Sequence, residues 1–213
     1  MNIAIVLFDG FTALDAVGPY ETLGRIPGAK VTFVAETPGP VRTDTGNMAI
    51  TADASLADLG DPEIFVIPGG PGQTRQMDND KLLTWVRQAH ETSTWTTSVC
   101  TGSLLLAAAG LLDGKKATSH WLALDQLPTF GAEPTLERVV FQDKIVTAAG
   151  VSSGIDMGLA LIARIHGDEV AQAVQLGIEY DPQPPFDAGS PEKAPAPIVD
   201  FLRASSRFML EGA

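Results

Sequence analysis

Residues Ser98 to Gly110 read SVCTGSLLLAAAG. A buried strand is expected to end at Val99, and a helix rich in Leu and Ala begins almost at once, at Gly102. Cys100 therefore falls in a tight turn between strand and helix, the elbow that holds a nucleophile at the carboxyl edge of a parallel sheet. The adjacent helix N-terminus is expected to favour the thiolate and to lower the pKa of Cys100. The alternative is a buried structural cysteine, the commonest role of a lone Cys.

Outward from this elbow, short β-branched runs alternate with longer helical patterns, which is typical of βαβ units and a mostly parallel sheet covered on both faces. The predicted strands are Ile3–Leu7, Val31–Ala35, Ile64–Ile67, Thr94–Val99 and Ile145–Thr147. The predicted helices are Ala13–Leu23, Asp80–Glu91, Gly102–Ala109, Trp121–Leu127, Gly154–Ile165 and Asp168–Leu176. The sequence thus predicts an α/β fold.

The remaining segments complete a single predicted domain over residues 1–213. Val41–Thr51 is expected to form a small β-hairpin around Gly46 and Asn47. The Pro-rich segment 181–197 cannot continue a helix and should run extended over the surface. A last amphipathic helix is expected at about Ile198–Met209, which is too short to build another core.

Composition and charge exclude several classes of protein. The 14 Lys and Arg residues against 26 Asp and Glu residues leave a net charge of −12, so nucleic acid and anionic membranes are poor partners. No apolar run reaches the roughly 18 residues of a transmembrane helix, and the N-terminus lacks the basic region of a signal peptide, so a cytoplasmic location is expected. The one cysteine and three histidines show no metal-ligand spacing, and we expect no metal site.

A glycine-rich turn, Ile67-Pro68-Gly69-Gly70-Pro71-Gly72, follows the third predicted strand. Glycines let the backbone approach a substrate closely, which makes Gly69 a candidate pocket residue. The amides of Gly70 and Thr101 are candidates for an oxyanion hole. A nucleotide loop is disfavoured, because the turn has neither a P-loop ending nor G-x-G-x-x-G spacing.

Three further positions carry candidate site residues, each with an ordinary structural alternative. Asp15, near the start of the first predicted helix, is either an N-terminal helix cap or a desolvated acid kept partly protonated; Glu21 is the competing acid. His120 is more often a satisfied structural histidine than a base, and its role stays open. Val151, in the loop before another helix, is a candidate pocket residue, and the neighbouring Ser152 a candidate cap.

With these motifs in place, the chain resembles the ThiJ/PfpI superfamily of class I glutamine amidotransferase-like proteins, and within it the bacterial isocyanide (isonitrile) hydratases. The Cys100 elbow and the Pro-rich tail are the specific parts of this resemblance, and Pro-Gly-Gly alone says little. The motifs that carry it are Leu14-Asp15, Gly18-Pro19, Ile67–Gly70, Thr97–Ser103, Ala117–Trp121, Gly154–Asp156 and Glu179–Phe186.

The resemblance implies a flavodoxin-like three-layer sandwich with a mostly parallel central sheet and a nucleophile elbow. It also implies Cys100 as nucleophile, Asp15 as its neighbouring acid, Thr101 as a hydroxyl and amide donor, and a homodimer. The implied reaction adds water to a small isocyanide substrate and gives an N-substituted formamide, without a metal or organic cofactor.

Differences between this sequence and other members of the superfamily argue against some of the alternative functions. Thr101 stands where the family's peptidases have a His, which argues against peptidase activity, and Asp15 in place of a Glu weakens a glyoxalase function. Similar domains sense ligands in AraC-type regulators, but those continue into a basic DNA-binding domain, whereas this chain is acidic and ends at Ala213, so DNA binding is not expected. A cysteine redox or ligand sensor stays open beside the enzyme.

Overall fold

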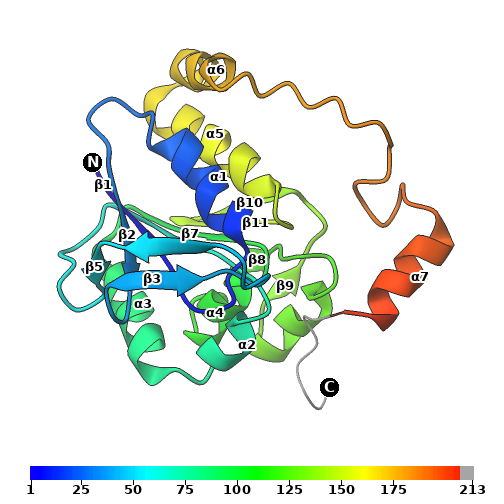
Figure 1. The fold of residues 1–213 in the computed structure, drawn as a ribbon, viewed down its shortest axis with the longest axis horizontal. Helices are drawn as coiled ribbons and strands as arrows, with labels where there is room; N and C mark the ends of the chain where they lie inside the picture. The colour runs from blue at the N-terminus through cyan, green and yellow to red at the C-terminus, as the bar shows by residue number, and fades with distance from the viewer. Residues whose placement is uncertain (207–213) are drawn as a thin grey trace.

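A computed structural model describes residues 1–206, and its centre is a seven-stranded sheet in the order β10-β11-β7-β6-β1-β2-β5 (Figure 1). All neighbouring strands are parallel except β10 and β11, which are antiparallel. The strands are β1 (Asn2–Val6), β2 (Lys30–Ala35), β5 (Ala54–Ser55), β6 (Ile64–Ile67), β7 (Trp95–Val99), β10 (Val139–Gln142) and β11 (Ile145–Ala148). The mostly parallel sheet predicted from the sequence is confirmed, with strand ends that differ by at most one residue.

Helices cover both faces of the sheet, which makes the three layers of a flavodoxin-like fold (Figure 1). On one face α1 packs against α5, and α5 against α6; on the other face α3 packs against α4. Because both faces are covered, the central strands β6 and β11 are buried along their whole length. The α-helices are α1 (Ala13–Leu23), α2 (Gln73–Gln76), α3 (Asp80–Thr92), α4 (Gly102–Ala108), α5 (Ser153–His166), α6 (Asp168–Gly177) and α7 (Ala196–Ala204).

Two small sheets lie beside the main one. The predicted hairpin is confirmed as the antiparallel pair β3 (Gly39–Arg42) and β4 (Ala49–Ala52). The other pair, β8 (Lys116–Ala117) and β9 (Glu133–Pro134), is parallel and was not predicted, because strands of two residues carry no periodicity.

The segment after β8 departs from the prediction. Instead of an α-helix over Trp121–Leu127, the chain forms a 3₁₀ helix, η1, over Leu124–Phe130. Pro128 lies inside it and has no amide hydrogen to donate to an α-helical turn, so a tighter helix results.

The C-terminal part of the described chain is an extended arm. Residues 180–195 contain no helix or strand and run away from α6 to α7, as Figure 1 shows in orange and red. The extended course of the Pro-rich segment agrees with the sequence. The predicted last helix exists but spans Ala196–Ala204, and its predicted end at Met209 lies outside the described residues.

Candidate active site

The elbow at Cys100 joins β7 to α4 and is formed as the sequence predicts. Cys100 has a φ of 59°, a left-handed conformation that is rare for a residue with a side chain. Its amide donates to the carbonyl oxygens of Ala148 and Ala149 at 3.1 and 2.8 Å, which ties the turn to the end of β11. The residue is completely buried. The strained turn therefore holds the thiol at the carboxyl edge of the sheet.

The glycine-rich turn after β6 lies directly against this elbow. A Cβ atom on Gly69 would lie 2.4 Å from the Thr101 amide nitrogen, and one on Gly70 would lie 2.5 Å from the carbonyl oxygen of Gly10. Gly70 also has a φ of 130°, which favours glycine. A glycine at position 69 thus allows the turn after β6 to touch the elbow after β7, and a glycine at position 70 allows the turn to pack on the segment after β1.

Asp15 reaches this turn from helix α1. Its side chain is completely buried, and Oδ2 accepts a hydrogen bond of 2.9 Å from the Gly69 amide. The cap alternative is wrong, because Thr12 occupies the N-cap position and the Asp15 carboxyl bonds to a different segment. Within residues 1–206, Asp15 Oδ1 has no hydrogen-bond partner. The carboxyl thus has one oxygen fixed by the backbone and one that remains available.

Asp15 and Cys100 form a coupled pair, since each perturbs the pKa of the other. Burial raises the pKa of Asp15 to about 7, although the Gly69 amide opposes the rise. Burial also raises the pKa of the Cys100 thiol well above its ordinary value, and the charge of Asp15 adds to this. The expected lowering by the helix N-terminus is therefore wrong, because burial beside an acid outweighs the short helix α4. Near neutral pH the pair holds at least one proton.

The donors around the sulfur differ in part from those expected. The amides of Val151 and Thr101 hydrogen-bond the Cys100 sulfur and favour its thiolate. The Gly70 amide instead donates to the Thr101 hydroxyl at 2.9 Å, so it is not directed at the sulfur. In this structure the amide pair at the thiol is Thr101 with Val151, and Gly70 positions Thr101. The sequence indicated Val151 only as a pocket wall, because its distance from Cys100 along the chain hides the contact.

His120 lies beside Gly150, which is in the loop between β11 and α5. Its Nδ1 accepts the Leu122 amide at 3.2 Å, and burial lowers its pKa to about 4, so the ring is neutral at ordinary pH. Its edge lies against Gly150, where a Cβ would come within 2.8 Å of the ring. The Ser152 hydroxyl does not cap α5; it accepts a hydrogen bond from Arg138 at 3.1 Å.

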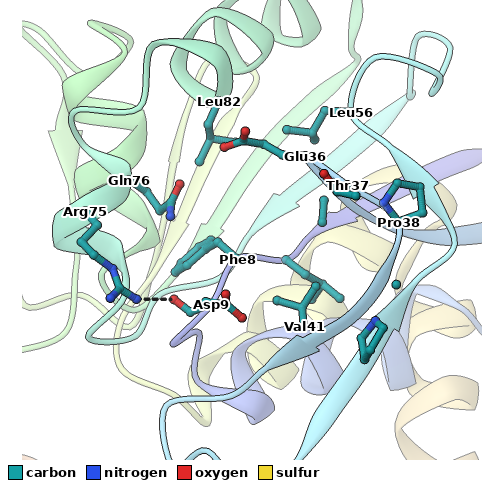
Figure 2. A pocket seen from close by; sticks show the side chains of 14 residues that line it. Phe8, Asp9, Glu36, Thr37, Pro38, Val41, Leu56, Arg75, Gln76 and Leu82 are labelled. Atoms are coloured by element: carbon teal, nitrogen blue, oxygen red, sulfur yellow. Dashed lines mark hydrogen bonds between the residues drawn. The ribbon is translucent and has the colours of Figure 1, made fainter.

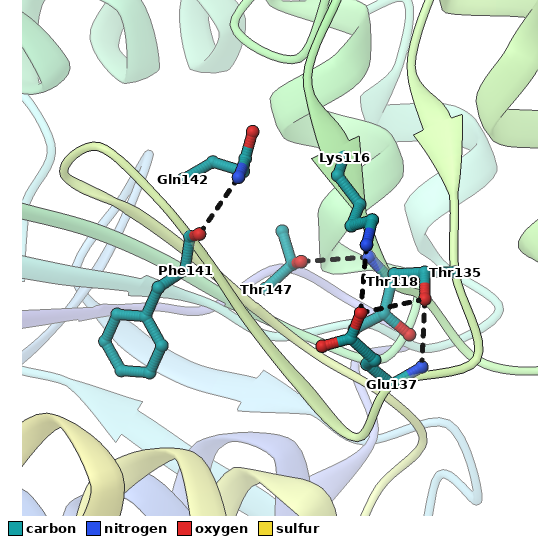
Figure 3. A network of polar contacts seen from close by, with 7 residues as sticks. All are labelled: Lys116, Thr118, Thr135, Glu137, Phe141, Gln142 and Thr147. Carbon is teal, nitrogen blue, oxygen red and sulfur yellow. Dashed lines mark hydrogen bonds and ion pairs between the residues drawn. The ribbon is translucent and has the colours of Figure 1, made fainter.

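The sequence did not single out Ser119, which also holds the elbow. The Ser119 hydroxyl donates to the carbonyl oxygen of Cys100 at 3.2 Å. Its neighbour Thr118 donates its amide to the Thr147 hydroxyl of β11 at 3.0 Å, and the nearby ion pair between Lys116 and Glu137 measures 3.1 Å (Figure 3). These contacts fix residues 116–120 beside the sheet edge that carries Cys100.

A cavity of about 400 Å³, which we call the inner cavity, adjoins the thiol. Three of its lining residues contact Cys100: Ser119, Ala149 and Val151. A different cavity of about 480 Å³ lies at the ends of β1 and β2, where Asp9, Glu36 and Arg75 face it (Figure 2). Cys100 and Asp15 are completely buried and line neither cavity, but only the inner cavity has walls that contact Cys100, so we assign the chemistry to the inner one.

Two further observations concern metals and membranes. Within residues 1–206, no group of three His, Cys, Asp or Glu side chains is arranged to hold a metal ion. None of the described helices is long and apolar enough to cross a membrane. The cytoplasmic location stays a prediction.

Comparisons with known proteins agree with this geometry. Residues 1–164 match the model of the DJ-1/PfpI family. An isonitrile hydratase from Pseudomonas putida is 40% identical over 203 residues, which cover 95% of this chain and 89% of that protein. The HTH-type transcriptional regulator CdhR from Pseudomonas aeruginosa is 32% identical over 176 residues, which cover 79% of this chain and 52% of the regulator.

Among solved structures, a ThiJ/PfpI family protein from Pseudomonas syringae superposes with a TM-score of 0.94 at 38% identity, covering 100% of this chain and 90% of that one. The oxidized DJ-1 of Toxoplasma gondii superposes with a TM-score of 0.75 at 27% identity, covering 85% of this chain and 99% of that one. Fold, elbow and sequence similarity lead to one conclusion: the chain belongs to the DJ-1/PfpI (ThiJ/PfpI) family.

Proposed function

We propose that this protein is an isocyanide hydratase, which converts R–N≡C and water into the formamide R–NH–CHO. One observation carries the proposal: a buried acid with a pKa of about 7 lies beside a buried thiol, and its Oδ1 has no hydrogen-bond partner within residues 1–206. The 40% identity to an isonitrile hydratase over most of both chains supports it.

An isocyanide makes an unusual demand on an enzyme. Its terminal carbon must gain both a nucleophile and the proton that becomes the formyl hydrogen. A thiol and an acid directed at the same atom meet this demand together. Since Gly69 fixes Oδ2 of Asp15, the proton to be transferred is carried by Oδ1.

In the first step Asp15 takes the proton of the Cys100 thiol, the sulfur bonds to the terminal carbon, and Asp15 delivers that proton to the same carbon. The product is the thioimidate R–N=CH–S–Cys100, and Asp15 is left as a carboxylate. The amides of Val151 and Thr101 stabilise the thiolate as it forms, which matters because burial otherwise disfavours it.

In the second step water adds across the C=N bond. Asp15 accepts one proton from the water and passes it to the nitrogen, while the hydroxide bonds to carbon and gives R–NH–CH(OH)–S–Cys100. The adduct then collapses: the hydroxyl proton returns to Asp15, the C–S bond breaks, and the formamide leaves. The pair again holds one proton, and no cofactor enters the scheme.

The test is formamide production from an aryl isocyanide, followed by ultraviolet absorbance. We expect Cys100→Ala to abolish turnover and Asp15→Asn to reduce it by about 10²–10⁴. Glu21→Gln is the matched control, because Glu21 is an exposed acid on the same helix and should leave the rate unchanged. An active Cys100→Ala protein would end the proposal; turnover of methylglyoxal in place of isocyanides would favour glyoxalase chemistry.

We further propose that the chain forms a homodimer through its C-terminal arm. Ile198, Phe201 and Leu202 are 51%, 68% and 41% exposed and share one face of α7 at helical spacing. Such a stripe is typical of a helix that packs against a partner. Light scattering should give twice the mass of the chain, and Phe201→Asp should shift the protein to monomer; a monomeric wild type would refute this.

A further inference from the structure

The inner cavity ends at Trp121. The same indole also lines a larger cavity of about 1010 Å³ beneath α7, which we call the outer cavity. The two cavities share Trp121, Leu136, Pro191 and Glu192 as walls. The indole therefore stands between the space next to the thiol and a space more than twice as large.

Contacts on two sides hold Trp121 in this place. Its ring stacks on His120, with ring centroids 6.1 Å apart and planes inclined by 29°. The guanidinium of Arg203, on α7, lies 5.7 Å from the indole centroid. A cation above an aromatic face is a stabilising arrangement. The side chain is thus a positioned wall of the inner cavity.

The charges of the inner cavity disfavour an anionic occupant. Arg138 lines it, but its Nε forms an ion pair with Asp156 at 2.5 Å. His120 is neutral, because burial lowers its pKa to about 4. Glu192 adds a carboxylate, which repels anions. The volume of about 400 Å³ falls at the small end of ligand sites, which span about 300–1,000 Å³.

We infer that the inner cavity holds the nitrogen substituent of the isocyanide, and that Trp121 sets its upper size limit at a single uncharged ring. This inference rests on the proposed function. Removing the indole would join the inner to the outer cavity, so a second ring on the substrate would gain space without any change at Cys100 or Asp15.

The test compares kcat/KM for phenyl isocyanide and for 4-biphenylyl isocyanide. In Trp121→Ala we expect the ratio of biphenylyl to phenyl turnover to rise at least about tenfold, mainly through KM for the larger substrate. Trp121→Leu, a milder change, should raise it less. Trp85→Ala is the control, because Trp85 is a half-buried indole that packs on Phe65 of β6 from helix α3. An unchanged ratio in both Trp121 variants, or an equal rise in Trp85→Ala, would overturn the inference.

A binding measurement separates this inference from the proposed function. Calorimetry on the Cys100→Ala protein with the formamides of the two amines needs no turnover. We expect N-phenylformamide to bind better than N-biphenylylformamide, and Trp121→Ala to narrow that gap. Turnover of isocyanides without this size effect refutes the role of Trp121 alone, whereas size-selective binding without any turnover refutes the hydratase alone.

Discussion

Replacing Asp15 by Asn should change how the stability of the protein depends on pH. The native carboxyl has a pKa of about 7 because it is buried, against 3.8 for the unfolded chain. The native state therefore binds a proton that the unfolded state has lost, and this contribution is fully present below pH 3.8 and is lost as the pH rises through about 7. At about 1.4 kcal/mol for each pH unit, the full effect is about 4 kcal/mol.

The Asn variant lacks this proton, so the free energy of unfolding of the variant minus that of the wild type should increase by about 3 kcal/mol between pH 4.5 and 8.5. The Asn amide will also lack an acceptor where Oδ1 stood, at a cost of about 1–3 kcal/mol. That cost is the same at every pH, so only the slope reports the protonation of Asp15.

The assay is urea unfolding of both proteins at five pH values between 4.5 and 8.5, with Glu21→Gln as the control for loss of an exposed carboxylate. We expect the free energy of unfolding of the Asn variant to gain on that of the wild type up to about pH 7 and to level off above it. A difference that stays constant within about 1 kcal/mol over this range would refute the reasoning, because Asp15 would then titrate alike in the folded and unfolded chains.

Two further predictions concern the neighbours of this acid. Gly69→Ala should destabilise the fold by about 3 kcal/mol or more, because the added Cβ would lie 2.4 Å from the backbone of the elbow. Gly177→Ala is the control and should be neutral, because its Cβ would meet nothing within 4 Å. Equal melting temperatures of the two variants would contradict this prediction. Alkylation of Cys100 by iodoacetamide at pH 8, read by intact mass, should be at least about tenfold slower than that of a free thiol, because burial and the charge of Asp15 raise the pKa of the thiol. Asp15→Asn removes that charge and should make the alkylation faster. A fast reaction of the wild-type protein would contradict this, because it would show an accessible thiolate.

The sequence was sufficient for the features that short windows contain. Most of the buried parallel strands are nearly continuous apolar runs, and the change from the strand that ends at Val99 to the helix that begins at Gly102 marks the elbow without any knowledge of its partners. Helix α1 was predicted with correct ends. The antiparallel β10 was not predicted, although Val139–Phe141 is an apolar run.

The site required contacts between distant segments. The sequence around Asp15 is compatible both with a helix cap and with a buried acid. The hydrogen bond that distinguishes them comes from the amide of Gly69, 54 residues later in the chain. The sequence also predicted the Gly70 amide as an oxyanion donor, whereas in the structure this amide donates its hydrogen bond to the Thr101 hydroxyl. Trp121 was expected as the first residue of a helix, whereas it lies in the turn that precedes η1 and lines both cavities.

The C-terminal arm supplies part of the wall of the inner cavity. The family match ends at residue 164, and it contains both Asp15 and Cys100. Residues 189–192 of the arm, which lie beyond that match, supply a wall of the inner cavity. The wall of the inner cavity is thus assembled from two stretches of the chain, one that carries the reacting pair and Trp121 and one that lies beyond the family match. Substitutions in residues 189–192 could therefore reshape the cavity without any change at Cys100 or Asp15.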